Sequence, residues 1–229
     1  MTNIRAIPKV LAICAALLVG VLSAAPAEAG FEDGVRAYLA QDYAAALNVW
    51  RPLAEEGHAP AQFGMGLSYE NGRGVERDPT QAAVWYHKAA EQGLADAQFN
   101  LGNLYLNASG VPKDPVEAVR WFRRAAEQGN AEAETRLGDM YREGKGVARD
   151  DAQALAWYLR AAEQSNARAQ IKLGFMYQDG MGVGQDYVEA YMWWSLAASQ
   201  DNAIAAGARE QVAGNMTAEE IAEARQRAR

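Results

Sequence analysis

The side chains that usually perform catalysis are few in this 229-residue sequence, and their spacing matches no common catalytic motif. A serine hydrolase of a familiar type would show a Gly-x-Ser-x-Gly elbow or a Ser-x-x-Lys pair, and the sequence contains neither. It also lacks the His-Glu-x-x-His zinc motif and a phosphate-binding Gly-x-x-x-x-Gly-Lys loop. We therefore expect no catalytic residue and no bound cofactor.

The sequence also has few of the residues that usually bind a metal ion. The only histidines are His58 and His87, and the single cysteine, Cys14, lies near the N-terminus. Structural metal sites usually need four such ligands close together. We interpret the two histidines as surface or repeat-junction residues, and we expect no metal site.

Two sets of regularly spaced side chains could still contact a ligand. The first is four tryptophans, which could stack on a sugar, but the alanines around them indicate packing in a core. The second is a Glu-Gln pair at the end of successive helices, which we interpret as solvated. The residues are Trp85, Trp121, Trp157 and Trp193, and Glu91-Gln92, Glu127-Gln128 and Glu163-Gln164.

A repeat of 36 residues organises most of the sequence. Five features occur in four copies without an insertion, which chance does not produce. In the first copy they are Gly66, Tyr69, Asp78, Trp85 and the pair Ala89-Ala90.

Each copy has the pattern of two helices. In copy one we expect a first helix over 61–71, ended by the Gly72-Arg73-Gly74-Val75 loop. Asp78 is a suitable N-cap for the second helix, and Pro79 suits its first position. Gly93 is its expected C-terminal stop. Small residues let the helices approach closely, and the large aromatic residues fill the space between neighbouring pairs.

These residues resemble the Sel-one-like repeats, a subclass of the tetratricopeptide-like solenoids. The third copy carries the pattern most fully, and the longer Gly-x-Gly-Val loop distinguishes the subclass from a plain tetratricopeptide repeat. The resemblance implies an all-α, right-handed α-solenoid of helix-turn-helix repeats. The pattern is Ala133, Leu137-Gly138, Tyr141, Gly144-Lys145-Gly146-Val147, Asp150, Ala154, Trp157-Tyr158 and Ala161-Ala162.

We predict the following organisation from this pattern. Residues 1–29 form a signal peptide, 30–58 an N-terminal tetratricopeptide-like half-module, and 203–229 a C-terminal helical cap whose last helix starts at the Thr217-Ala218-Glu219-Glu220 capping box. The four repeats occupy 59–94, 95–130, 131–166 and 167–202.

Three positions depart from the pattern. Ser165 and Asp201 replace the glycine that ends the second helix, so we expect those two helix ends to be turned less sharply. In copy two, Leu106-Asn107-Ala108-Ser109 replaces the first glycine of the loop, so the repeat pattern does not define the geometry of that loop.

One face of the first helix varies between copies while the core positions stay constant. Its positions are 60, 64, 67 and 71 in copy one, and each of these plus 36 in the next copy. The variable residues are Asp96, Asn100, Asn103 and Asn107 in copy two, Glu132, Arg136, Asp139 and Glu143 in copy three, and Arg168, Lys172, Phe175 and Asp179 in copy four.

The resemblance implies that first helices line the concave surface on which such solenoids bind extended peptides or partner helices. Amides hydrogen-bond a peptide backbone, cations hold a carboxylate, and an aromatic ring anchors an apolar side chain. A solvated helix face is the competing interpretation. The candidate partner-binding residues are Asn100, Asn103, Arg136, Lys172 and Phe175.

The N-terminus has the pattern of a secretory signal peptide. Arg5 and Lys9 precede an apolar run from Val10 to Ala25, and Ala27-Glu28-Ala29 fits a cleavage site before Gly30. Cleavage would remove Cys14 and change the net charge from −7 to −8, because Arg5, Lys9 and Glu28 leave with the leader. We expect an exported chain, periplasmic or secreted, that has no stable membrane span after cleavage and does not bind nucleic acid.

Two functions from different classes fit this sequence. The first, implied by the resemblance, is a non-enzymatic protein-protein interaction scaffold or adaptor in the bacterial cell envelope. Its partner is a protein or an extended peptide. The alternative is a cell-envelope enzyme, such as a β-lactamase-like or peptidoglycan-acting hydrolase, which the absence of a serine–lysine pair and of cysteine in the mature chain disfavours.

Overall fold

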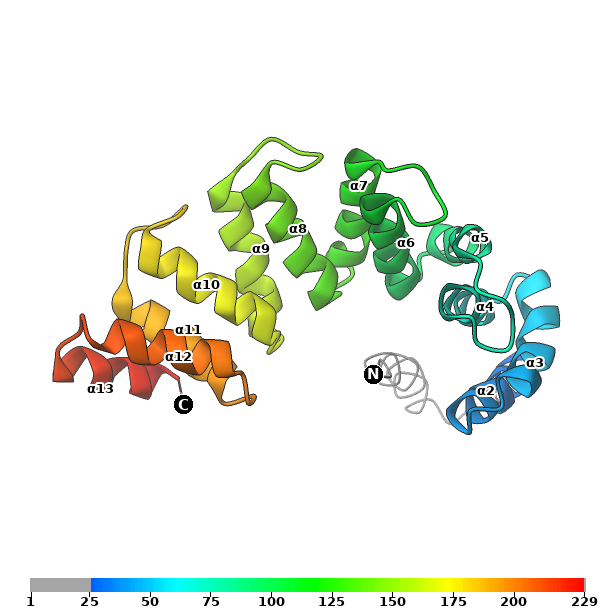
Figure 1. Ribbon diagram of the computed structural model, residues 1–229, viewed down its shortest axis with the longest axis horizontal. Helices are drawn as coiled ribbons and strands as arrows, with labels where there is room; N and C mark the ends of the chain where they lie inside the picture. The colour runs from blue at the N-terminus through cyan, green and yellow to red at the C-terminus, as the bar shows by residue number, and fades with distance from the viewer. Residues whose placement is uncertain (1–25, 229) are drawn as a thin grey trace. The chain divides into compact units, whose positions relative to one another are not determined.

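The computed structural model describes residues 26–228, and within them all regular structure is helical (Figure 1). The predicted signal peptide lies outside the described residues except for 26–29, which open the first helix. The helices are α2 (Pro26–Leu39), α3 (Tyr43–Glu55), α4 (Ala59–Asn71), α5 (Pro79–Glu91), α6 (Ala95–Asn107), α7 (Pro115–Glu127), α8 (Ala131–Glu143), α9 (Asp151–Glu163), α10 (Ala167–Asp179), α11 (Tyr187–Ala198), α12 (Ala203–Ala213) and α13 (Ala218–Arg227).

The chain divides into two compact units, with the boundary between Lys113 and Asp114. In the first unit α2 packs on α3, α3 on α4, α4 on α5 and α5 on α6. In the second unit the same pairing runs from α7 to α11. Within each unit, from α2 to α6 and from α7 to α11, successive helices therefore pack on one another, and the predicted all-α repeat solenoid is confirmed.

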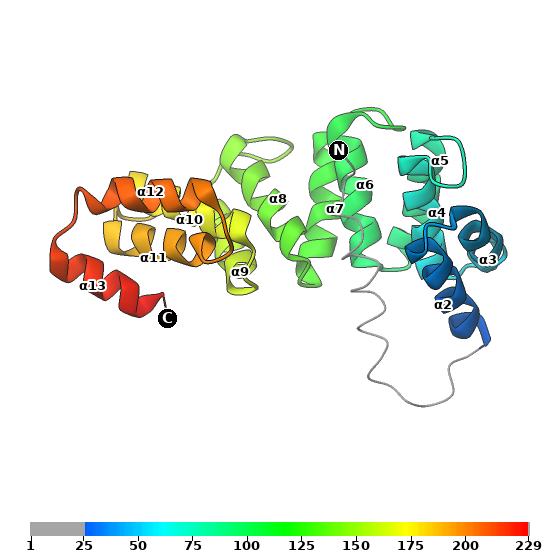
Figure 2. The same cartoon turned by 60° about the horizontal axis from the view of Figure 1, so that its bottom comes forward.

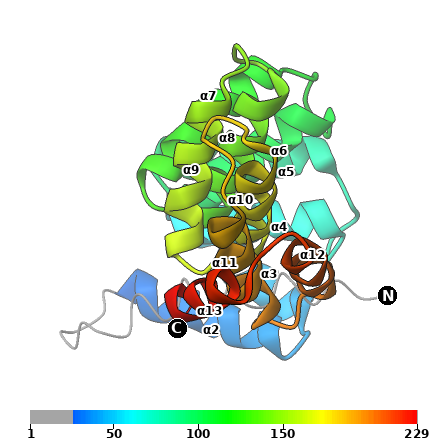
Figure 3. The ribbon, with the colours of Figure 1, turned by 90° about the vertical axis from the view of Figure 1, so that its left-hand side faces the viewer.

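The C-terminal part of the second unit breaks this simple order. Both α12 and α13 pack on α11, and Figures 2 and 3 show them lying beside it. Ala205, Val212 and Ala224 complete a buried cluster with Tyr191 and Trp194 of α11. The predicted capping box is present, since Thr217 accepts from the Glu220 amide and Glu220 accepts from the Thr217 amide.

Helix starts follow the sequence closely. The side chains of Asp78, Asp114, Asp150 and Asp186 each accept a hydrogen bond from a backbone amide in the first turn of a second helix. Asn130, Asn166 and Asn202 cap the helices that follow them in the same way. These short acceptors fix where each helix begins.

Helix ends correct two sequence expectations. Ser165 and Asp201 have φ values of 62° and 60°, so they make the same left-handed turn that the glycines make. Ala108, with φ 55°, likewise takes the left-handed conformation that Gly72, Gly144 and Gly180 take after other first helices. The packing of the repeat therefore imposes the turn, although a Cβ makes this conformation costly.

The tightest helix packing is between a glycine and an aromatic ring. A Cβ on Gly138 would lie 2.6 Å from the Tyr158 ring, and one on Gly174 would lie 2.3 Å from the Trp194 indole. Gly66 faces Tyr86 in the same manner. Any larger residue on the first helix would push the ring of the second helix away.

This packing corrects the assignment of the repeated tryptophans. Trp85 and Trp121 are buried, but Trp157 and Trp193 are only half-buried. The next residue along is instead 0% exposed in all four copies: Tyr86, Phe122, Tyr158 and Trp194. The rings at this position are of three types, so a search for identical residues between copies does not reveal this buried position.

Candidate functional site

The five candidate residues all lie on first helices, but they divide between the two units. Asn100 and Asn103 are on α6 of the first unit. Arg136 on α8, and Lys172 and Phe175 on α10, belong to the second unit. All five side chains are at least partly exposed.

In the first unit the two amides are used internally. Asn103 donates from Nδ2 to the Phe99 carbonyl at 3.1 Å, and its Oδ1 is buried without a hydrogen-bond partner. Asn100 hydrogen-bonds the hydroxyl of Tyr86, which donates to Glu70 at 2.6 Å. The structure therefore gives these asparagines roles in the unit itself.

The variable positions of copy one do not form an exposed face, which corrects the sequence interpretation. Gly64 and Leu67 are buried. A Cβ on Gly64 would lie 2.7 Å from the Trp50 ring of α3, so the preceding module covers this position. Of these four positions, only Asn71, at the end of α4, is exposed.

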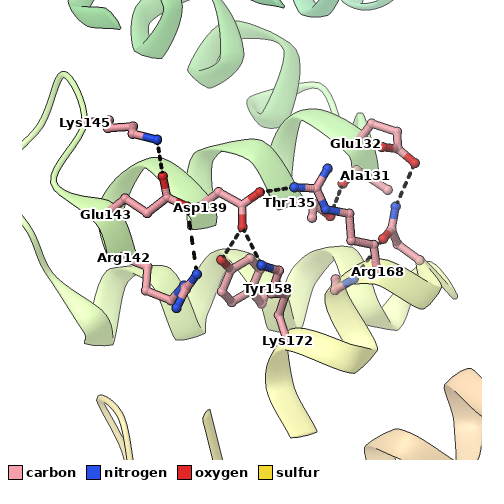
Figure 4. A network of polar contacts seen from close by, with 12 residues as sticks. Ala131, Glu132, Thr135, Asp139, Arg142, Glu143, Lys145, Tyr158, Arg168 and Lys172 are labelled. Atoms are coloured by element: carbon pink, nitrogen blue, oxygen red, sulfur yellow. Dashed lines mark hydrogen bonds and ion pairs between the residues drawn. The ribbon is translucent and has the colours of Figure 1, made fainter. Parts of the chain in front are cut away.

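In the second unit Lys172 belongs to a polar network around a buried carboxylate, Asp139 of α8 (Figure 4). Tyr158 of α9 donates its hydroxyl proton to Asp139 Oδ1 at 2.8 Å. Lys172 Nζ lies 3.4 Å from the same oxygen, and Arg168 donates to Oδ2. Three helices, α8, α9 and α10, therefore meet at one carboxylate.

Burial shapes the protonation of this cluster. Burial, followed by the charge of Asp139, raises the pKa of Tyr158 well above its ordinary value. The hydroxyl therefore stays protonated and acts as a donor. Burial and the nearby Arg168 charge lower the pKa of Arg136, because both disfavour a second cation there.

The other carboxylates of α8 have partners of their own. Glu132 accepts from Asn166 Nδ2 at 3.2 Å. Glu143 lies 2.6 Å from Lys145 Nζ. Asp139 is thus the carboxylate that Arg168 and Lys172 share.

Phe175 lies one turn beyond Lys172 on α10. Its side chain is 37% exposed, which is high for a phenylalanine. One part of the ring packs edge-on against Trp194 of α11, with ring centres 5.2 Å apart. The arrangement holds an apolar surface rigidly beside the cations.

A cationic side chain covers the ring of three of the repeated tryptophans, which does not suit the sugar-stacking interpretation. The guanidinium of Arg124 lies 4.5 Å from the centre of the Trp121 ring, and that of Arg160 lies 4.7 Å from Trp157. Lys88 Nζ lies 4.1 Å from Trp85. A cation three residues later on the same helix therefore covers the indole face in three copies.

Sequence reasoning missed a row of buried polar side chains on the first helices. Gln62 donates to the Ala54 carbonyl at 3.0 Å and accepts from Gln92 at 2.7 Å. Gln170 repeats both bonds, and Gln98 repeats the first with Ala90. In copy three the equivalent residue is Glu134, which accepts from Gln164 and lies 3.3 Å from Arg160 Nε.

This row also corrects the interpretation of the Glu-Gln pairs. Glu91, Glu127 and Glu163 are exposed, as expected. The glutamines at 92 and 164, however, use their side chains to reach a buried partner on the preceding first helix. The sequence signal was available, since a polar residue recurs at 62, 98, 134 and 170 at the repeat step.

The first unit has a cavity of about 410 Å³ between α5, α6 and the loop that follows α6. Leu101 and Ala83 line its floor, and Val84 lies on its exposed rim. Its volume is at the lower end of the range for ligand pockets. No residue pattern in the sequence indicated this hollow.

Residues 26–228 contain no group of three His, Cys, Asp or Glu side chains placed to hold a metal ion. In the same range, every helix is too short or too polar to cross a bilayer.

Comparison with known proteins identifies the family. The model of the Sel1 repeat matches residues 59–94, 95–130, 131–166 and 167–202. The chain belongs to the Sel1 repeat family. The resemblance noted in the sequence is thereby confirmed. Proteins with Sel1 repeats are generally protein-interaction scaffolds and are typically non-enzymatic.

Solved structures agree with this assignment. A Sel1 repeat protein from Oxalobacter formigenes shares 39% identity over 76% of this chain and 72% of its own, with a TM-score of 0.72. The protein c5321, a protective antigen present in uropathogenic Escherichia coli strains, displays an SLR fold and shares 33% identity, with a TM-score of 0.66. That match covers 96% of this chain but only 55% of c5321.

More distant similarity extends to immunity protein PA5088 from Pseudomonas aeruginosa. It shares 26% identity over 81% of this chain and 70% of its own, with a TM-score of 0.52. A search of curated proteins finds no match to this sequence.

Proposed function

We propose that this Sel1 repeat protein is an exported, non-enzymatic scaffold that binds a protein partner through the first-helix face of its second unit. We define this cationic face as Arg136, Arg168, Lys172 and Phe175. The observation that carries the proposal is the convergence of three cations near a single buried carboxylate, Asp139, with the exposed ring of Phe175 one turn beyond Lys172 on the same helix. Packing alone would be satisfied by apolar or neutral residues at these positions.

Three features of the cationic face suit it to binding. Asp139 of α8, itself held by the Tyr158 hydroxyl of α9, pairs with Lys172 and Arg168, so those cations are positioned before a partner arrives. Preorganisation lowers the entropic cost of association. Phe175 offers the kind of rigid aromatic anchor that contributes strongly to interfaces.

The partner can be captured directly. A photo-crosslinking amino acid at position 175, expressed in the native cell envelope, should capture a protein that mass spectrometry identifies. The same amino acid at position 120, an exposed site on α7, is the control. Capture of the same proteins from both positions, or of none from 175, would contradict the assignment of the face.

Substitution of two cations tests the face with the captured partner. Arg136→Ala combined with Lys172→Ala should weaken binding at least about tenfold, or about 1.4 kcal/mol, with thermal stability little changed. The matched control is Arg120→Ala with Arg149→Ala, which removes the same charge from exposed sites elsewhere in the second unit. Calorimetric titration measures both. Equal weakening in the control would mean that net charge, not the face, governs binding.

Export is part of the proposal and rests on the N-terminal sequence alone. We expect the mature chain to begin at Gly30 and to lie in the periplasm or outside the cell. N-terminal sequencing of the protein from cell fractions measures this. A full-length chain recovered from the cytoplasm would refute it.

The enzyme alternative is tested separately. Purified mature protein should show no turnover of a β-lactam and no release of fragments from peptidoglycan. Turnover that survives purification and disappears with a point substitution would replace the scaffold proposal.

A further inference from the structure

Three cations of the cationic face, Arg136, Arg168 and Lys172, lie near the buried carboxylate of Asp139. Both oxygens of Asp139 are already engaged, Oδ1 by Tyr158 and Lys172 and Oδ2 by Arg168. Arg136 lies on the same helix as Asp139, three residues earlier, and adds a third cation beside this engaged carboxylate.

Arg136 is the side chain of the cationic face that has a buried hydrogen-bond donor without a partner in residues 26–228. Its Nε is buried and has no hydrogen-bond partner within the described residues. Glu132 and Glu143 of α8 attract the charge of Arg136, but the hydrogen bond and ion pair recorded for their oxygens go to Asn166 and Lys145. A buried guanidinium N–H without an acceptor is unfavourable, and a carboxylate supplied from outside would complete its hydrogen bonding.

We propose that the cationic face binds an acidic segment of a partner polypeptide, which presents two neighbouring carboxylates and an apolar side chain close after them. One carboxylate pairs with Arg136 and the second lies between Arg168 and Lys172. The apolar side chain packs on the exposed edge of Phe175. This inference rests on the proposed function and specifies the chemistry of its partner.

Charge complementarity favours a short peptide over a larger polyanion. The chain carries a net charge of −7, so a long anion that extends beyond the face is repelled. Two arginines on different helices offer planar donor pairs that fit carboxylates. Phe175 adds an apolar contact that a simple inorganic anion does not use.

The probe is a fluorescein-labelled Gly/Ser peptide that contains two adjacent glutamates followed closely by a leucine. Its binding to the full mature chain is measured by fluorescence anisotropy. Three comparison peptides replace both glutamates by glutamine, replace the leucine by serine, or carry both changes. Inorganic phosphate serves as a competitor that supplies anionic charge alone.

We expect the Glu-Glu-Leu peptide to bind at least about tenfold more tightly than the Gln-Gln peptide, and added salt to reduce the difference. Arg136→Gln should remove most of this preference, and Arg136→Lys should restore part of it. Phe175→Ser should weaken the leucine peptide but leave the serine peptide unchanged. Arg120→Gln on α7 is the control that keeps full binding.

Equal binding of the glutamate and glutamine peptides would overturn the inference. So would an Arg136→Gln variant that binds like the parent, or a leucine peptide that binds no more tightly than the serine peptide. If crosslinking from position 175 still captures a partner in that case, the scaffold proposal stands and only the acidic chemistry fails. If neither occurs, both fail.

Discussion

At the residue scale, adjacent side chains on one helix have different structural roles. Trp194 is 0% exposed and contacts Gly174, whereas Trp193 is half-buried at the edge of the preceding pair. Identity between repeats marks position 193, but burial marks position 194. Identical residues at a fixed spacing therefore locate the repeat, but they do not show which residue of the repeat is most deeply buried.

Removal of these two tryptophans should have unequal effects. Trp194→Ala should lower the free energy of unfolding by about 3–5 kcal/mol, because it leaves a large cavity beneath Gly174. Trp193→Ala should cost less than half as much. Urea unfolding followed by circular dichroism measures both. Equal losses would mean that the half-buried ring is as important to packing as the buried one.

A second residue-scale prediction concerns Glu134, which replaces the glutamine of the other copies. An ionised carboxylate accepts from Gln164 but cannot donate to a carbonyl as Gln62, Gln98 and Gln170 do. Burial raises the pKa of Glu134 above its ordinary value. The charge of Arg160 on α9 and the hydrogen bond from Gln164 lower this pKa in part, and the negative charge of Glu163 raises it further. Glu134→Gln should therefore stabilise the protein by about 1 kcal/mol at neutral pH.

The sign of the pH dependence follows from that raised pKa. The folded state holds the Glu134 proton more tightly than the unfolded chain does. Its contribution to stability is therefore fully present below the ordinary pKa of 4.5 and is lost as the pH rises through the raised value. The stabilisation by Glu134→Gln should be larger at about pH 7 than at about pH 4. A constant difference across this range would mean that Glu134 does not titrate with a raised pKa.

At the element scale, the ends of the helices are decided by packing and not by residue type. Ala108, Ser165 and Asp201 adopt positive φ where other copies have glycine. The loop after α6 is held closely, since a Cβ on Gly110 would lie 2.0 Å from the Pro79 carbonyl oxygen. The neighbouring elements therefore fix the backbone conformation of the turn.

Glycine at such a position should relieve strain. Ala108→Gly should stabilise the protein by about 0.5–1 kcal/mol, because the left-handed conformation costs a non-glycine residue about 1–2 kcal/mol and the greater freedom of the unfolded glycine offsets part of the gain. The reverse change at the matched position, Gly144→Ala, should destabilise by a similar amount. Thermal unfolding of both variants measures this. A loss of stability in Ala108→Gly would show that the alanine methyl group makes a contact worth more than the strain.

At the scale of the whole molecule, each repeat depends on its neighbours to cover an apolar face. In the second unit this face ends at α11, and α12 and α13 cover it with Val212, Ala205 and Ala224. Arg225 also donates to the Tyr191 hydroxyl at 3.2 Å. The C-terminal segment is thus part of the core of this unit and not an appendage.

Deletion of residues 203–229 should therefore destabilise the second unit by about 3 kcal/mol or more, since it exposes several apolar side chains to water. Tryptophan emission should shift to longer wavelength, because Trp194 loses part of its cover. Thr217→Ala, which removes only the helix cap, should cost about 1 kcal/mol and serves as the graded control. A truncated chain as stable as the parent would show that α11 needs no cover.

The sequence by itself determined the repeat, its two helices, their caps and the family. These follow from local rules, because an Asp, Asn or Gly acts on the backbone within a few residues of itself. The sequence also identified the helix face that carries Arg136, Lys172 and Phe175, since its residues vary while the core repeats.

Only the tertiary structure decided which of these residues act together. Asp139 meets Arg168 and Lys172 across two helices, at separations of 29 and 33 positions, so no local pattern reveals the cluster. The same holds for the left-handed Ala108 and for the central ring at position 194. In each case the deciding interaction joins residues far apart in the chain, and the close packing of neighbouring helices sets its geometry.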